Sequence, residues 1–318
     1  MPTSAPPATS HPAEPATPRV LAVSIDGLTP EALRALGRRG APAIWALIDA
    51  GASTLNARTE FEQTVTLPNH VGMVTGRRID PQVGGHGVTW NEELPDRTVQ
   101  SAAGGEVQSI FTAVHDSGGT TAVFAGKTKF RLFEASWPDA VDTTVITASM
   151  SRLGRQVARD VRAHAHTFTF LHLAAPDQVG HSLGWMSEPY LDAVVQADDV
   201  VGRLVELVRA DPELSRDLSV VLTADHGGEG RVHADATDAD DYTVPFVVVG
   251  PTVERGDLYA LSPDLADPLT GRPTYAGPQP VRNCDLANVS TQLLGIDPVP
   301  GSTCNGYRGM PLEAVERP

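Results

Sequence analysis

The chain has 318 residues, of which 41% are hydrophobic and 20% are charged, a composition typical of a globular protein with a sizeable core. Acidic residues outnumber basic residues by 39 to 24, and the formal net charge is −15. This balance argues against non-specific binding of nucleic acid or of a membrane surface, because both require a basic face. It does not exclude a nucleotide substrate, because bound metal ions can supply local positive charge. No apolar run approaches the roughly 20 residues of a membrane span.

The N-terminal segment 1–18 is rich in Pro, Ala, Ser and Thr, and this composition predicts disorder. It lacks the charged and apolar regions of a signal peptide, although a linker left after removal of a leader would look the same. The only cysteines are Cys284 and Cys304. A disulfide between them would indicate secretion or a periplasmic location, whereas two buried thiols would leave the cytoplasm open.

From Arg19 onward, short apolar runs alternate with segments of helical periodicity. Runs without polar alternation are typical of strands that are covered on both faces. We expect strands at 19–25, 121–125, 167–173, 218–223 and 244–249. We expect helices at 31–36, 43–50, 107–116, 149–164, 188–210 and 285–294. This alternation predicts a single α/β domain over residues 19–318, with a mostly parallel central sheet between helices.

Candidate metal ligands follow three of the expected strands. Asp26 follows the first strand, Asp177 follows the strand at 167–173, and Asp225 and His226 follow the strand at 218–223. Ligands of open parallel sheets bind beyond the carboxyl ends of the strands, so these residues are expected to converge. His181 lies four residues after Asp177, a spacing that on a helix directs both side chains at one ion. Each residue alone is more often a cap or a turn residue, but together they predict a metal centre.

Thr66 precedes a short predicted helix that starts near Pro68 and Asn69. A threonine hydroxyl becomes a nucleophile only when a metal or a base takes its proton, and the N–H groups at a helix start favour an anion there. The amide of Asn69 could then donate to a phosphoryl oxygen. In the simpler interpretation Thr66 caps the helix, and the two roles are compatible.

This ordered set of motifs resembles the alkaline phosphatase superfamily, and within it the nucleotide pyrophosphatase/phosphodiesterase branch. The resemblance rests on Asp26-Gly27, Thr66-Leu-Pro-Asn69-His70, Asp177-x-x-Gly180-His181 and Asp225-His226-Gly227. It implies an alkaline-phosphatase-like fold and two zinc ions per chain. By position, the first zinc would be bound by Asp177 and His181, and the second by Asp26, Thr66, Asp225 and His226. Thr66 would be the nucleophile, and Asn69 would donate to the phosphoryl oxygen.

The last zinc ligand departs from the pattern of that branch. There the final histidine lies far downstream of the Asp-His pair, whereas the last histidine of this chain is His233, seven residues after His226. His233 lies in a glycine-rich loop that is flexible enough to fold back. Because a zinc site takes at least three protein ligands, we expect His233 to complete the first zinc site.

Basic and aromatic residues supply further candidates for the pocket. Lys127, Lys129 and Arg131 follow the strand at 121–125 and could reach a phosphate. Lys129-Phe130-Arg131 resembles the Lys-x-Arg of monoesterases in the same superfamily, where these side chains hold the additional charge of a monoester dianion. In the simpler interpretation they form a solvated basic helix start. Trp90, Asn91 and Trp185 could also line the pocket, but their spacing does not decide this.

Taken together, the motifs predict a zinc-dependent phosphoesterase. It would hydrolyse phosphodiester or nucleotide pyrophosphate bonds of a small substrate through a phosphoryl group on Thr66. Phosphomonoesters are the second candidate class, because of Lys129 and Arg131, and phosphonates are a third. A hypothesis of another class is a non-catalytic zinc-binding relative, which would need neither Thr66 nor Asn69. The natural leaving group and the oligomeric state stay open.

Overall fold

In the computed structural model, which describes residues 17–304, eight strands form one sheet in the order β4-β3-β5-β1-β6-β7-β2-β8. Strand β7 runs antiparallel to its neighbours β6 and β2, and the other neighbouring pairs are parallel. The strands are β1 (Arg19–Ile25), β2 (Ala52–Arg58), β3 (Thr121–Ala125), β4 (Thr143–Ile146), β5 (Phe168–Leu173), β6 (Leu218–Thr223), β7 (Thr243–Val249) and β8 (Gly256–Asp257).

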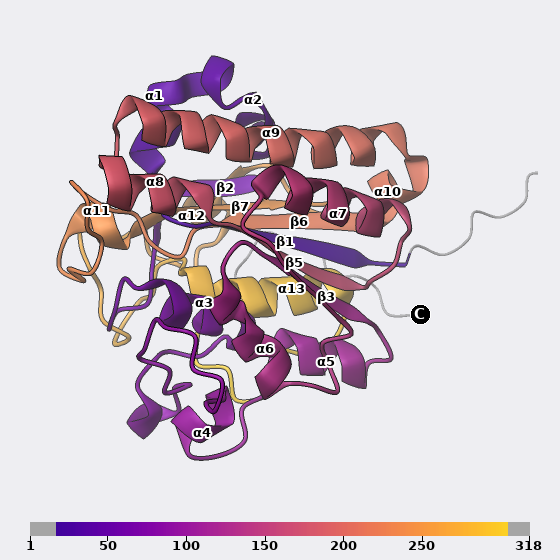
Figure 1. Cartoon of the computed structure of the whole chain (residues 1–318), viewed down its shortest axis with the longest axis vertical. Coiled ribbons are helices and arrows are strands. Elements are labelled where there is room, and N and C mark those ends of the chain that lie inside the picture. The colour runs from indigo at the N-terminus through magenta and orange to yellow at the C-terminus, as the bar shows by residue number, and fades with distance from the viewer. Residues whose placement is uncertain (1–16, 305–318) are drawn as a thin grey trace, which may run out of the picture.

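Helices cover both faces of this sheet (Figure 1). On one face lie α1 (Pro30–Gly40), α2 (Pro42–Ala50), α7 (Met150–Arg162), α8 (Ala175–Leu183), α9 (Glu188–Ala210) and α10 (Pro212–Asp217). On the other lie α3 (Thr66–Thr75), α5 (Ile110–Asp116), α6 (Arg131–Ser136) and α13 (Leu286–Leu294). The remaining short helices are α4 (Val99–Ala103), α11 (Ala239–Tyr242), α12 (Leu258–Leu261), η1 (Pro81–Val83), η2 (Thr128–Phe130) and η3 (Asn283–Asp285).

The predicted fold class is confirmed, since a mostly parallel sheet lies between two layers of helices. Every residue of β3 and β5 is buried, as is all of β1 after Arg19, which explains the uninterrupted apolar runs of these strands. The predicted disordered segment falls almost wholly outside the described residues, as do the last residues of the predicted domain. Within residues 17–304, no helix is both long and apolar enough to cross a membrane.

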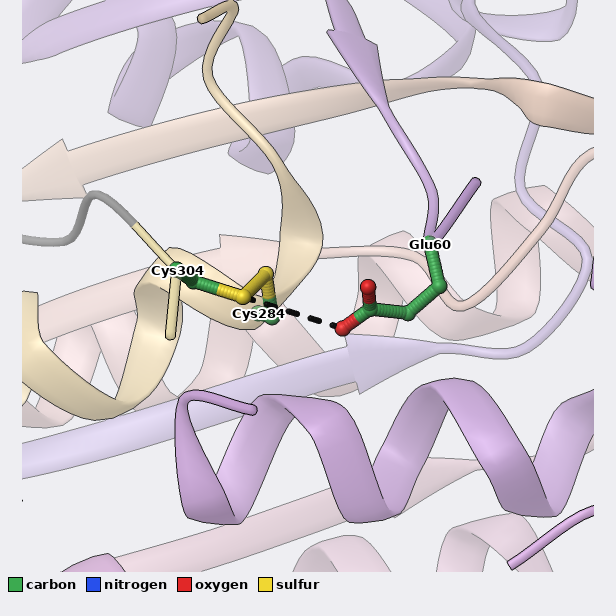
Figure 2. Close-up of side chains that lie close together, drawn as sticks. All are labelled: Glu60, Cys284 and Cys304. Atoms are coloured by element: carbon green, nitrogen blue, oxygen red, sulfur yellow. Dashed lines mark hydrogen bonds between the residues drawn. A yellow bond between two sulfur atoms is a disulfide. The ribbon is translucent and has the colours of Figure 1, made fainter. Parts of the chain in front are cut away.

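A disulfide joins Cys284 of η3 to Cys304 (Figure 2). Of the two alternatives for the cysteines, the structure therefore shows the covalent pair. The fully buried Glu60 lies beside this bond, with its Oε1 3.8 Å from Cys304 Sγ. A disulfide sulfur carries no hydrogen, so Glu60 can donate in this contact only when its carboxyl group is protonated. The same carboxyl group accepts a short hydrogen bond from the hydroxyl of Tyr275.

Candidate active site

Three aspartates lie at the carboxyl ends of three neighbouring strands. Asp26 directly follows β1, Asp225 comes shortly after β6, and Asp177 lies in α8, which follows β5. Strand β1 pairs in parallel with β5 on one side and β6 on the other, so all three strands end at the same edge. Each aspartate is at most 3% exposed. The structure thus brings together the three carboxylates that the order of elements suggested.

Gly27 shapes the turn that links these strand ends. Its φ of 71° lies in the left-handed region, and a Cβ at this position would lie 3.1 Å from the Cα of Asp177. Its N–H donates to Asp225 Oδ1 at 3.1 Å, while the N–H of Asp177 donates to the carbonyl of Asp26 at 3.1 Å. A residue without a side chain therefore lets the three aspartate segments approach one another.

The first group of candidate ligands consists of Asp177, His181 and His233, whose ligand atoms all lie within 4.8 Å of one another. His181 Nε2 is 3.3 Å from Asp177 Oδ1, and His233 Nε2 is 3.7 Å from the same oxygen. The two histidine Nε2 atoms are 3.1 Å apart. The loop carrying His233 thus folds back over α8, as expected from its glycines.

The second group consists of Asp26, Asp225 and His226, also within 4.8 Å of one another. Thr66 joins this group, because its Oγ1 is 3.3 Å from His226 Nε2. The two groups adjoin: His226 Nε2 is 3.9 Å from Asp177 Oδ1, and the rings of His226 and His233 stack with centroids 3.6 Å apart. The two groups contain the residues that the resemblance assigns to the two zinc ions, with His233 in the first group.

The histidine rings are oriented as metal ligands are. The Nδ1 atoms of His181, His226 and His233 face the backbone carbonyls of Arg231, Gly227 and Thr64, at 3.0, 2.9 and 2.7 Å respectively. Because a carbonyl only accepts, each Nδ1 carries the hydrogen, and in a neutral ring Nε2 then presents a lone pair. The facing Nε2 atoms of His181 and His233 therefore need a shared cation, either a proton or a metal ion.

The carboxylates fit the same interpretation. Asp26 Oδ1, Asp177 Oδ1 and Asp225 Oδ2 are buried and have no hydrogen-bond partner within residues 17–304. These are the oxygens that face His226 Nε2, at 3.5, 3.9 and 3.1 Å. Buried carboxylate oxygens without partners are costly, and metal coordination would satisfy them. A donor set of carboxylate oxygens, imidazole nitrogens and one hydroxyl suits zinc.

Burial of three carboxylates close together shifts the pKa values of the groups at the site. Burial is the largest influence on Asp225 and raises its pKa, and the neighbouring Asp26 raises it further. For His226, burial lowers the pKa, but the three aspartates outweigh it and the pKa rises to about 9. The centre therefore attracts cations, and a metal ion that binds His226 must displace its proton.

Thr66 is the first residue of α3, and its side chain does not cap the helix. The N-cap position belongs to Val65, which makes no side-chain cap. The hydroxyl faces the second ligand group instead, through its contact with His226 Nε2. The capping interpretation is therefore wrong, because the helix starts one residue earlier than a cap at Thr66 requires.

The amide of Asn69 is used in hydrogen bonds within the protein, contrary to the expected role of phosphoryl-oxygen donor. Its Nδ2 donates to the carbonyls of Gln63 at 2.8 Å and Val65 at 3.0 Å. Its Oδ1 accepts from Glu60 N and from Asn283 Nδ2, both at 3.0 Å. With both amide hydrogens and the oxygen already hydrogen-bonded, Asn69 holds the loop before α3 and has no donor left for a substrate.

Asn91 lies beside the start of α3, and its Nδ2 makes no hydrogen bond to the part of the chain that the structure describes. Its Oδ1 accepts from the N–H of Leu67 at 3.0 Å and from Lys129 Nζ at 2.7 Å. Because both partners are donors, the atom between them must be the oxygen, which leaves Nδ2 with both hydrogens next to the nucleophile's helix turn. From the sequence, Asn91 was only a possible pocket residue, since no spacing rule links it to Thr66.

The basic residues after β3 separate in the structure. Lys129 reaches Asn91, whereas Arg131 is exposed and faces Glu93 with 3.7 Å between Nε and Oε1. The turn η2 lies between Lys127 and α6, so Arg131 begins a helix and is not brought to the nucleophile. Lys127 instead lies inside the centre, a position that the sequence did not predict.

Comparisons with known proteins identify the family of the chain. The profile of the family described as "Type I phosphodiesterase / nucleotide pyrophosphatase" matches residues 20–243. The chain is 28% identical over 235 residues to ectonucleotide pyrophosphatase/phosphodiesterase family member 1 of Rattus norvegicus, covering 69% of this chain and 25% of that protein. The Homo sapiens protein of the same name is 29% identical over 233 residues, covering 67% and 24%. The chain thus spans about a quarter of the length of these relatives.

Solved structures show the same fold. An inactive variant of murine ectonucleotide pyrophosphatase/phosphodiesterase 5 in complex with AMP superposes with a TM-score of 0.65 at 14% identity, covering 91% of this chain and 97% of that one. The structure named Ps i-CgsB gives a TM-score of 0.58 at 15% identity, covering 93% and 76%. The family match spans most of the chain and includes every candidate ligand from Asp26 to His233. The chain therefore belongs to the type I phosphodiesterase/nucleotide pyrophosphatase family.

Proposed function

We propose that this protein is a zinc-dependent hydrolase that cleaves phosphodiester or nucleotide pyrophosphate bonds with Thr66 as nucleophile. The observation that carries the proposal is the hydroxyl of Thr66, which lies at a helix start and contacts His226 in the second of two adjoining groups of carboxylates and imidazoles. The family supports the class of reaction, and the relatives named above are pyrophosphatases/phosphodiesterases. The AMP complex of the murine structural neighbour supports a nucleotide as substrate.

We assign one zinc ion to each ligand group. Asp177, His181 and His233 would hold the first, and Asp26, Asp225, His226 and Thr66 the second. When bound, two such ions stabilise the attacking and leaving oxygens as Lewis acids and lower the pKa of a coordinated hydroxyl. The unpartnered aspartate oxygens and the fixed histidine tautomers support this assignment.

The residues of the chain then carry out two displacements. Thr66 Oγ1 attacks phosphorus, the bond to the leaving oxygen breaks, and the phosphoryl group is left on Thr66. Asn91, held by its oxygen, donates from Nδ2 to a phosphoryl oxygen as negative charge develops there. Water next attacks phosphorus and restores the threonine, so the configuration at phosphorus is retained overall.

Replacing Thr66 tests the nucleophile directly. In Thr66→Ala, turnover of a p-nitrophenyl diester should fall by about 1,000-fold or more, because no hydroxyl remains to accept the phosphoryl group. The first ligand group does not include Thr66, so zinc should still bind. Thr66→Ser is the matched control and should retain measurable turnover. Unchanged activity in Thr66→Ala would rule out the proposed nucleophile.

The non-catalytic alternative is tested on the wild-type protein. A zinc-loaded chain that turns over neither p-nitrophenyl monoesters nor diesters anywhere between about pH 6 and 10, the range in which zinc-activated hydroxyls ionise, would support a zinc-binding module instead.

Phosphomonoesters remain the second candidate substrate, and Lys129 is the observation that favours them. Its ammonium group lies 2.7 Å from Asn91 Oδ1, close enough to the proposed phosphoryl position to offset the second charge of a dianion. Lys129→Met should then slow monoester hydrolysis by about 10-fold or more relative to diester hydrolysis. Arg131→Met is a matched control, because Arg131 points at Glu93. Equal effects of Lys129→Met on both substrates would remove the reason to consider monoesters.

A further inference from the structure

We propose that Lys127 is an internal counter-cation that joins the two ligand groups and keeps the centre assembled before any metal ion binds. This inference rests on the metal centre proposed above. It concerns the metal-free protein, and it assigns Lys127 a positioning role that acts through Asp26 and Asp177.

One ammonium group contacts a carboxylate from each group. Lys127 Nζ lies 2.6 Å from Asp26 Oδ2 and 2.6 Å from Asp177 Oδ2. The other oxygen of each aspartate, Oδ1, is the one that faces the imidazoles without a hydrogen-bond partner among residues 17–304. Lys127 therefore holds the outer oxygens and leaves the inner oxygens directed at the proposed ion positions.

The fold brings Lys127 to this place from a fourth strand end. Lys127 follows β3, which pairs with β5, so its side chain reaches across the ends of β5 and β1. At the preceding residue, the N–H of Gly126 donates to His172 Nδ1 at 3.2 Å. His172 Nε2 in turn donates to Asp26 Oδ2 at 2.7 Å, the same oxygen that Lys127 contacts. The lysine is thus part of a fixed network that sets the orientation of Asp26.

The charges explain why such a residue is needed. Asp26, Asp177 and Asp225 place three carboxylates within one buried cluster, where water screens their repulsion poorly. The side chain of Lys127 is only 14% exposed, so its charge acts in the same weakly screened environment. Removing it would leave Asp177 Oδ2 without the only hydrogen bond that the structure gives that oxygen among residues 17–304. Two divalent cations would supply four positive charges and relieve the same repulsion.

The inference therefore predicts an effect that depends on metal. Wild type, Lys127→Met and Lys129→Met are compared as full-length proteins by thermal unfolding, each after chelation and again with saturating zinc. Without metal, Lys127→Met should lower Tm by roughly 5–10 °C, the loss expected when one partner of a buried charge pair is removed. With zinc, the same variant should unfold within about 2 °C of the wild type.

Lys129→Met is the matched control. It removes the same charge from a neighbouring position, but Lys129 Nζ contacts the amide oxygen of Asn91 and not a carboxylate. Its Tm should change by less than about 2 °C in both states. Lys127→Arg retains the charge, so in the metal-free state its Tm should fall less than that of Lys127→Met.

The outcomes separate this inference from the proposed function. If zinc does not raise the Tm of the wild type, the metal centre itself is wrong. Zinc could instead stabilise the wild type while Lys127→Met lowers Tm equally with and without zinc, or lowers it no more than Lys129→Met does. Either result would overturn only the role of Lys127. A Lys127→Met protein that cannot be recovered even with zinc would also contradict it, because bound cations should replace the missing charge.

Discussion

Each histidine of the candidate centre is fixed by a backbone carbonyl at Nδ1, and this detail decides what its other nitrogen can do. The sequence showed the residue types, the four-residue spacing of Asp177 and His181, and the glycines before His233. It could not show which carbonyls would meet the rings, because these belong to loops whose course depends on tertiary packing. The same reason explains the error at Asn69, whose amide is used by the loop before α3.

Asn69 and Asn91 should respond differently to the same substitution. Asn91→Ala removes the proposed donor and should lower kcat by roughly 100-fold with little change in Tm. Asn69→Ala removes four hydrogen bonds, two of them buried and two partly buried, and should destabilise the fold by about 2–4 kcal/mol. Steady-state kinetics and thermal unfolding of both variants measure the contrast. A large fall in kcat for a stable Asn69→Ala protein would restore the original assignment.

Glu60 should make stability depend on pH. Burial, the main cause, raises its pKa from 4.5 to about 8. Between these two values the unfolded chain loses this proton while the folded chain keeps it, so stability should fall by a few kcal/mol as the pH rises from about 4.5 to about 8.

The neutral amide in Glu60→Gln should remove this dependence. Urea unfolding of both zinc-loaded proteins at several pH values tests this prediction. As the pH rises, the free energy of unfolding of the variant should increase relative to that of the wild type. A constant difference between the two proteins would show that Glu60 titrates normally.

At the scale of elements, the long buried strands and helices could be predicted, whereas the short or partly polar ones could not. The five predicted strands are present to within a residue at their ends, because each is covered on both faces. Strand β2 was missed because its sequence, Ala-Ser-Thr-Leu-Asn-Ala-Arg, mixes polar and apolar residues without a clear period. Helices α4, α6 and α10 have only five or six residues, too few to show periodicity.

The turn after β1 should be the least tolerant part of the scaffold. Gly27→Ala introduces both a strained φ and a Cβ against Asp177, so it should lower stability by about 1–3 kcal/mol and reduce zinc content. Gly104→Ala is a control with a similar φ of 72° but nothing within 4 Å of the added Cβ. It should cost about 1 kcal/mol and leave zinc content unchanged. Normal zinc content in Gly27→Ala would contradict the tight approach of α8 to β1.

For the whole molecule, the alternation of apolar runs and helical segments predicted the fold class correctly, whereas the net charge was a poor guide to the charge near the site. The chain carries a formal charge of −15, yet Lys129 contacts Asn91 beside the proposed nucleophile, and Lys127 contacts both Asp26 and Asp177. From the sequence, the two cysteines could form a disulfide or remain as buried thiols, and the structure shows the disulfide. A disulfide is typical of proteins in oxidising compartments, and it favours the exported alternative.

The central claim is that two divalent cations bind side by side at the ends of β5, β1 and β6. Anomalous diffraction at the zinc edge, from a crystal of the zinc-loaded protein, tests it most directly. We predict two peaks: one about 2.0–2.2 Å from ligand atoms of Asp177, His181 and His233, and one at the same distances from Asp26, Asp225, His226 and Thr66. A single peak, or peaks remote from these side chains, would contradict the proposed centre.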